Sequence, residues 1–159
     1  MATIRPALPS EEAALLALTP RLADFPVPAW RTAHEIATAD HHILVEALHR
    51  PDGSSCILVA VNDAGGLLGY VFSSTKTDYF TGERHGHVEV LTLAPAAEGQ
   101  GLARRLMAAA EQWAIGLGYP RMTLNVFATN SRARGLYQRL GYGEETMHYV
   151  KELRPEGQA

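Results

Sequence analysis

The fold is best indicated by one stretch, Leu91-Thr-Leu-Ala-Pro95-Ala-Ala-Glu-Gly99-Gln-Gly101-Leu-Ala103-Arg-Arg105. Its apolar start is typical of a strand, Pro95 interrupts that strand, and the glycines lead directly into an amphipathic helix. The first turn of a helix has unpaired backbone N–H groups and the positive end of the peptide dipoles. Because glycine has no Cβ, it lets the backbone approach a bound anion closely. The stretch therefore predicts a site for a pyrophosphate or a similar anion.

Around this stretch, helical and extended patterns alternate along the chain. Strands are expected over residues 4–8, 56–61, 67–73, 88–93, 122–127 and 146–150, and helices over residues 13–18, 37–48, 102–117 and 130–140. Asn62 to Gly66 predicts a hairpin turn, and the polar residues 75–86 are expected to form a loop or the frayed ends of strands. This order predicts an α/β fold in which a mixed sheet has helices on its faces.

A second motif completes the first, and it reads Asn130-Ser-Arg-Ala133-Arg-Gly-Leu136-Tyr137-Gln-Arg-Leu-Gly141-Tyr142. Together the two motifs resemble the GCN5-related N-acetyltransferase (GNAT) superfamily. That family has Gln/Arg-x-x-Gly-x-Gly/Ala at the head of a helix, and later Asn-x-x-Ala-x-x-Leu-Tyr followed by Gly-Phe/Tyr. The resemblance covers about residues 55–151. One position departs from it, because Glu98 stands where the family has Gln or Arg.

The resemblance implies a fold and a donor. The fold is a mixed, mostly antiparallel β-sheet flanked by helices on both faces, in a single domain over residues 1–159. The acceptor side is expected in the helical N-terminus, about residues 1–50, and the acetyl-CoA-binding core over about residues 86–142. The residues implied for acetyl-CoA binding are Leu91, Leu93, Gly99, Gln100, Gly101, Leu102, Ala103, Arg104 and Asn130.

The departure at Glu98 has an electrostatic consequence. A carboxylate in contact with pyrophosphate is repelled by about 1 kcal/mol in water, and by more in a less polar site. We therefore expect the Glu98 side chain to turn outward into solvent.

Tyr137 is the first candidate for catalysis. At helical spacing it shares a face with Ala133, Leu136 and Leu140, so its hydroxyl is expected in the interior. The resemblance implies that Tyr137 is the general acid that protonates the departing CoA sulfur. A core tyrosine without such a role has the same pattern. Asn130 is also a good helix N-cap, a role compatible with contacting CoA.

A base is needed as well, because an amine is mostly protonated at neutral pH. In an extended strand His85, His87, Glu89, Leu91 and Leu93 share one face. We predict Glu89 as the base, directly or through water, and His87 as the second candidate. Glu89 as an ion-paired sheet residue stays open. His85, His87 and Glu89 also have metal-ligand spacing, but without a second cluster no metal is expected.

These residues predict an acetyl-CoA-dependent N-acetyltransferase that moves an acetyl group directly to a primary amine on a small molecule or a peptide. The acceptor is expected between the N-terminal helices and the loop 75–86. Two alternatives stay open, a non-catalytic acyl-CoA-binding sensor, favoured by Glu98, and a metal-dependent domain using the His-x-His-x-Glu residues.

Composition and charge limit the expected location and partners of the protein. The 159 residues have a net charge of −3 and one cysteine, Cys56, expected to be a core residue. This charge gives no basic patch for nucleic acid, and no apolar run approaches the roughly 20 residues of a membrane span. The N-terminal residues lack a signal-peptide pattern, so a cytoplasmic location without membrane partners is expected. A homodimer through the strand at 146–150 is a further option, because that strand is expected at a sheet edge.

Overall fold

Five strands form one sheet in the computed structural model, which describes residues 1–155 and 157. They are β1 (Thr3–Pro6), β2 (Ser55–Val61), β3 (Leu67–Thr77), β4 (Arg84–Leu93) and β5 (Met122–Leu124). The strands lie in the sheet in sequence order, the first four antiparallel and β5 parallel to β4. The predicted mixed, mostly antiparallel sheet is thus confirmed. The predicted domain range, residues 1–159, includes residues 156, 158 and 159, which lie outside the described residues.

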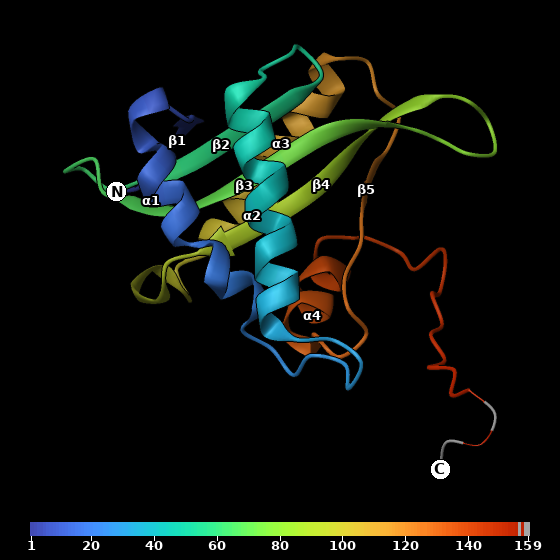
Figure 1. Cartoon of the computed structure of the whole chain (residues 1–159). Coiled ribbons are helices and arrows are strands. Elements are labelled where there is room, and N and C mark those ends of the chain that lie inside the picture. The colour runs from blue at the N-terminus through green and yellow to red at the C-terminus, as the bar shows by residue number, and fades with distance from the viewer. Residues whose placement is uncertain (156, 158–159) are drawn as a thin grey trace.

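Helices cover both faces of this sheet (Figure 1). They are α1 (Glu12–Ala17), α2 (Ala33–His49), α3 (Leu102–Gly116) and α4 (Ser131–Arg139), with 3-10 turns η1 (Pro9–Glu11), η2 (Thr19–Ala23) and η3 (Pro95–Ala97). Helices α1 and α2 pack on one face, and α3 packs on the other. No helix in the described part of the chain is long and apolar enough to span a membrane.

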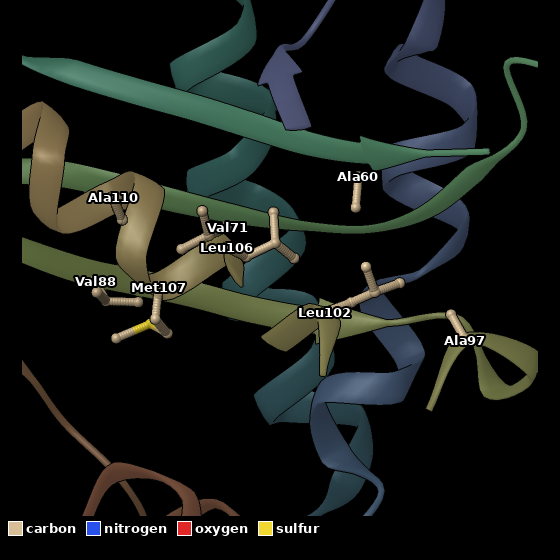
Figure 2. Close-up of a cluster of buried hydrophobic side chains, with 8 residues drawn as sticks. All are labelled: Ala60, Val71, Val88, Ala97, Leu102, Leu106, Met107 and Ala110. Carbon is tan, nitrogen blue, oxygen red and sulfur yellow. The ribbon is translucent and has the colours of Figure 1, made fainter. Parts of the chain in front are cut away.

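The apolar side chains divide into two clusters, one on each face of the sheet. The cluster under α3 contains Ala60, Val71, Val88, Ala97, Leu102, Leu106, Met107 and Ala110 (Figure 2). The cluster under α1 and α2 contains Leu15, Leu44, Val59, Val61, Tyr70, Phe72 and Val90. Alternating residues of β2, β3 and β4 point to opposite faces, so each strand contributes to both clusters.

A bulge in β4 breaks this alternation. Phe72 lies opposite Val90, whereas the next residue, Ser73, lies opposite Val88, so Glu89 is the extra residue. Val88, before the bulge, and Leu91, after it, therefore both pack on the α3 side. The expectation that His85, His87 and Glu89 share a face with Leu91 and Leu93 is wrong, because it assumed an unbroken strand.

Residues 75–86 contain both of the predicted features, a loop and the ends of strands, because β3 continues to Thr77, β4 begins at Arg84 and residues 78–83 connect them. The turn between them is stabilised by Asp78, whose Oδ1 accepts the N–H groups of Phe80 and Thr81 at 2.9 Å. The strand predicted over residues 146–150 does not form. Met147 and Tyr149 of this segment are 70% and 85% exposed, so no burial supports a strand, and the argument for a homodimer through it is lost.

Candidate active site

The glycine turn has the conformation that the sequence predicts. Gly99 and Gly101 have φ values of +76° and +73°, and Gly101 is the N-cap of α3. No heavy atom of the fold lies within 4 Å of the place where a Cβ would stand on either glycine. The left-handed backbone therefore requires glycine, and the open space leaves the N–H groups at the start of α3 accessible to an anion.

The neighbouring residues of the turn contribute mainly through their backbones. The Gln100 amide donates to the Ala96 carbonyl at 3.0 Å, which fixes the preceding turn. Leu102 is buried in the α3 cluster, Ala103 is half-buried and Arg104 is exposed. Of these residues, only Arg104 has a charged side chain free to reach an anion from the surface.

Glu98 is 30% exposed, but its carboxylate is not free in solvent as expected, because two arginines hold it. Arg21 of η2 contacts Oε1, and Arg132 of α4 lies 3.1 Å from Oε2. The hydrogen bond from Arg132 is the main cause that lowers the pKa of Glu98. The turn therefore has a neutralised carboxylate at its edge, and the repulsion of a bound anion is weaker than the sequence alone predicts.

The strand β4 has an open edge next to this turn. Its pairing with β5 ends where Val88 lies opposite Leu124. After that point the chain that follows β5 leaves β4 on its way to α4 (Figure 1). Residues Val90 to Leu93 pair with β3 but not with β5, and the bulge residue Glu89 pairs with neither strand. The side chains of Leu91 and Leu93 pack against the α3 cluster. A ligand along this edge would therefore contact the peptide groups of these two residues rather than their side chains.

Both candidate bases lie together on the α2 side of the sheet. Glu89 Oε1 accepts hydrogen bonds from Ser74 Oγ at 2.6 Å and Lys76 Nζ at 2.8 Å. His87 Nε2 is 4.0 Å from Glu89 Oε2, and His87 Nδ1 is 2.8 Å from Thr123 Oγ1. Glu89 is thus ion-paired with Lys76, which was the open alternative to a role as base, while Oε2 is left for another contact.

The environment shifts the pKa values of both candidates downward. Burial disfavours the charged form of Glu89, but the hydrogen bonds from Lys76 and Ser74 outweigh it and lower the pKa. Burial also lowers the pKa of His87, against the opposing charge of Glu89. Both groups are therefore in their proton-accepting forms at neutral pH. Among the described residues no group of three His, Cys, Asp or Glu side chains is arranged to hold a metal.

Tyr137 lies on the opposite side of the sheet from these bases. It packs against the α3 cluster, and its ring meets that of Tyr142 edge to face with centroids 6.0 Å apart. Burial raises the pKa of Tyr137 to about 12, so the phenol stays protonated at neutral pH. Asn130 is confirmed as the N-cap of α4, where its Oδ1 accepts the Ala133 N–H at 3.2 Å.

Sequence reasoning did not single out three charged residues of this region. Arg132 lies inside the second motif, so the spacing of the motifs gave a weak indication that Arg132 lies near Glu98. Arg21 had none, because its η2 turn comes next to the glycine turn only through the fold. Asp40 on α2 is partly buried, and burial followed by the charge of Glu89 raises its pKa to about 6. Helical periodicity alone did not show that Asp40 is partly buried and that the charge of Glu89 affects its pKa.

Comparisons with known proteins show the family to which the chain belongs. The sequence profile of the Acetyltransferase (GNAT) family matches residues 17–142. A mycothiol acetyltransferase from Jonesia denitrificans is 31% identical over 102 residues, which cover 64% of this chain and 31% of that protein. A mycothiol acetyltransferase from Salinispora tropica is 39% identical over 98 residues, covering 60% and 31%. The chain therefore spans about a third of the length of these two relatives.

Solved structures share the whole fold at low identity. A putative acetyl transferase from Pyrococcus furiosus has a TM-score of 0.78 at 22% identity, covering 96% of this chain and 100% of that chain. An aminoglycoside N-acetyltransferase in complex with CoA has a TM-score of 0.72 at 20% identity, covering 98% and 96%. These likenesses concern the fold alone. The profile match spans well over half of the chain and confirms the resemblance of the two motifs, so the chain belongs to the acetyltransferase (GNAT) family.

Proposed function

We propose that this protein is an acetyl-CoA-dependent N-acetyltransferase that transfers the acetyl group directly to a primary amine. The observation that carries the proposal is the position of the open edge of β4. It runs from the glycine turn to Glu89, with candidate bases on one side of the sheet and a protonated tyrosine on the other. Family membership and the acetyltransferase names of the relatives support the type of reaction.

The glycine turn is suited to bind acetyl-CoA, the acetyl donor. The N–H groups of Gly99 to Ala103 would hold the pyrophosphate, because the turn is open and each glycine has the required φ. Arg104 and Asn130 lie at the starts of the two helices next to this site and would add side-chain contacts. The peptide groups of Leu91 and Leu93 would bind the pantetheine arm along the unpaired edge of β4. When bound, acetyl-CoA supplies an activated acetyl group as a thioester.

The protein side chains would move the protons. Glu89 accepts a proton from the amine, directly or through water, and His87 is the alternative base. A backbone N–H of β4 stabilises negative charge on the carbonyl oxygen. Tyr137 donates its proton to the sulfur that leaves, and its raised pKa keeps that proton available.

Release of free CoA thiol tests this function. Purified protein is incubated with acetyl-CoA and one of ethanolamine, putrescine, spermidine, glucosamine or kanamycin A. We expect amine-dependent thiol release, and mass spectrometry should find the amine heavier by one acetyl group. Binding of acetyl-CoA without turnover of any primary amine would instead support a sensor that does not catalyse transfer. Acetylation of a cysteine of the protein as an intermediate would contradict direct transfer.

A further inference from the structure

The ring of His87 has a different neighbour at each of its two nitrogens. Because β5 pairs with β4 in parallel, the register places Thr123 beside His87. Thr123 Oγ1 lies 2.8 Å from His87 Nδ1, and His87 Nε2 lies 4.0 Å from Glu89 Oε2. The side chain of His87 is only 12% exposed, so the surrounding residues limit rotation of the ring.

Thr123 determines which ring nitrogen of the neutral His87 has the hydrogen. The threonine hydroxyl has a single hydrogen, which Oγ1 donates to the carbonyl of Gly86 at 3.4 Å. The contact between Oγ1 and Nδ1 then requires a hydrogen on Nδ1, which donates to Oγ1. The opposite assignment would put an N–H on Nε2 with no acceptor within hydrogen-bond distance among the described residues. Nε2, the ring nitrogen nearer Glu89, therefore has the free lone pair.

Glu89 has a second free acceptor at the same place. Its Oε1 accepts hydrogen bonds from Ser74 and Lys76, while Oε2 has no hydrogen bond with any described residue. Burial lowers the pKa of His87, and the hydrogen bonds to Glu89 lower the pKa of its carboxyl, so both groups can accept a hydrogen at neutral pH. Nε2 and Oε2 are too far apart to bond each other, and a donor placed between them would satisfy both.

The ammonium group of an amine is such a donor. It has three N–H groups, and a nitrogen about 2.9 Å from each acceptor fits between two atoms that are 4.0 Å apart. A cleft of about 290 Å³ between α2 and the sheet is lined by Ile43, Phe72, Ser74 and Glu89, among others. An amine that enters this cleft therefore reaches the side chain of Glu89.

We propose that Thr123 is a positioning residue, which holds His87 so that Nε2 and Glu89 Oε2 together bind the ammonium nitrogen of the acceptor. The inference rests on the proposed transfer to an amine. One N–H bond of the ammonium breaks, its proton forms an O–H bond with Oε2, and the electron pair stays on the nitrogen for the attack on the thioester. Nε2 accepts a hydrogen bond from a remaining N–H and so orients that electron pair.

Two substitutions separate the hydroxyl of Thr123 from its shape. Thr123→Val keeps the branched side chain and removes the hydroxyl, whereas Thr123→Ser keeps the hydroxyl and removes the methyl group. With whichever of the five named amines wild type turns over fastest, Thr123→Val should raise the KM for the amine about fivefold at pH 7.5 and leave the KM for acetyl-CoA unchanged. Thr123→Ser should stay within about twofold of wild type. The control is Thr77→Val, which removes an exposed threonine hydroxyl at the end of β3 and should change nothing.

Nitrogen-15 NMR of histidine-labelled protein measures the position of the hydrogen on His87 without any turnover, and His87→Gln identifies its signals. We expect the hydrogen on Nδ1 in wild type and in Thr123→Ser, and a shift toward Nε2 in Thr123→Val. A hydrogen on Nε2 in wild type would overturn the proposal. An unchanged KM for the amine in Thr123→Val, or an equal rise in Thr123→Ser, would overturn it as well.

The proposed transfer and this binding site can fail separately. If wild type acetylates none of the amines, calorimetric titration of each amine into the protein with CoA tests the site by itself. Binding that is weaker in Thr123→Val but not in Thr123→Ser supports the site although the transfer fails. Equal binding by wild type and both variants overturns the site, and so does the absence of binding by wild type.

Discussion

Asp40→Asn should make the protein more stable at neutral pH. The carboxyl of Asp40 has a pKa of about 6 in the folded protein, against an ordinary value of 3.8, because burial and Glu89 disfavour its charge. A raised carboxyl pKa means that the folded state binds the proton more tightly than the unfolded state. The stability of wild type therefore falls as the pH rises from about 4 to about 6, and stays lowered above that range. Asparagine resembles the protonated acid and has no such dependence.

The size of the effect follows from this difference in pKa. Two pKa units at 1.36 kcal/mol each give an upper limit of about 3 kcal/mol, and partial exposure of Asp40 reduces it to about 1–3 kcal/mol. For a chain of this size each kcal/mol corresponds to about 2–4 °C in Tm. Urea denaturation followed by tryptophan fluorescence at pH 4.5, 6.0 and 7.5 measures it. We expect Asp40→Asn to exceed wild type at pH 7.5, with the two converging at pH 4.5.

The matched control is Glu35→Gln, which removes one negative charge from a 45% exposed side chain of the same helix and should follow wild type at each pH. The reasoning is refuted if Asp40→Asn is less stable than wild type at pH 7.5, or if their difference is the same at all three pH values.

Three further predictions concern other residues. Replacing Arg21 and Arg132 together by alanine should weaken acetyl-CoA binding about fivefold in a fluorescence titration, because the charge of Glu98, then without either arginine, repels a phosphate by about 1 kcal/mol. Adding Glu98→Gln should restore the binding, and no recovery would contradict this cause. Tyr137→Phe should lower kcat by about 10²-fold with little change in the KM for acetyl-CoA, and an unchanged kcat would remove Tyr137 as the acid. Burial raises the pKa of Cys56 to about 11, so iodoacetamide at pH 7.5 should leave Cys56 unmodified in the folded protein by mass spectrometry, whereas rapid alkylation would show an accessible thiolate.

Local patterns predicted the parts of the fold that depend on neighbours in sequence. The glycine turn, the α3 face and the N-cap at Asn130 each follow from spacing within one segment, and the structure has all three. The prediction of a strand at 146–150 was wrong. Alternating apolar and polar residues show that a segment could bury one face, but not that a neighbouring strand is present to pair with it. Likewise, the bulge at Glu89 depends on pairing with β3, which no single-strand pattern contains.

The charged environment of the site was harder to predict for the same reason. Glu98 contacts Arg21 across 77 positions of sequence, and the charge of Glu89 on β4 raises the pKa of Asp40 on α2. Such pairs arise when distant elements pack, and no spacing rule along the chain brings them together. Sequence reasoning therefore selected the turn that should hold the donor, but it assigned Glu98 to solvent and left Asp40 out.

The most direct test of the donor site is stabilisation of the purified protein by acetyl-CoA. NAD and ATP are the comparison ligands, and Gly101→Asp is the variant of the glycine turn. At 100 times its dissociation constant a ligand adds about 2.7 kcal/mol to stability, which is a clear rise in Tm. Aspartate at Gly101 places a side chain and a negative charge at the start of α3, where the backbone has φ +73°. We expect a rise in Tm with acetyl-CoA that NAD and ATP do not match and that Gly101→Asp loses. An unchanged Tm for wild type, or an equal rise in Gly101→Asp, would contradict the placement of the donor at this turn.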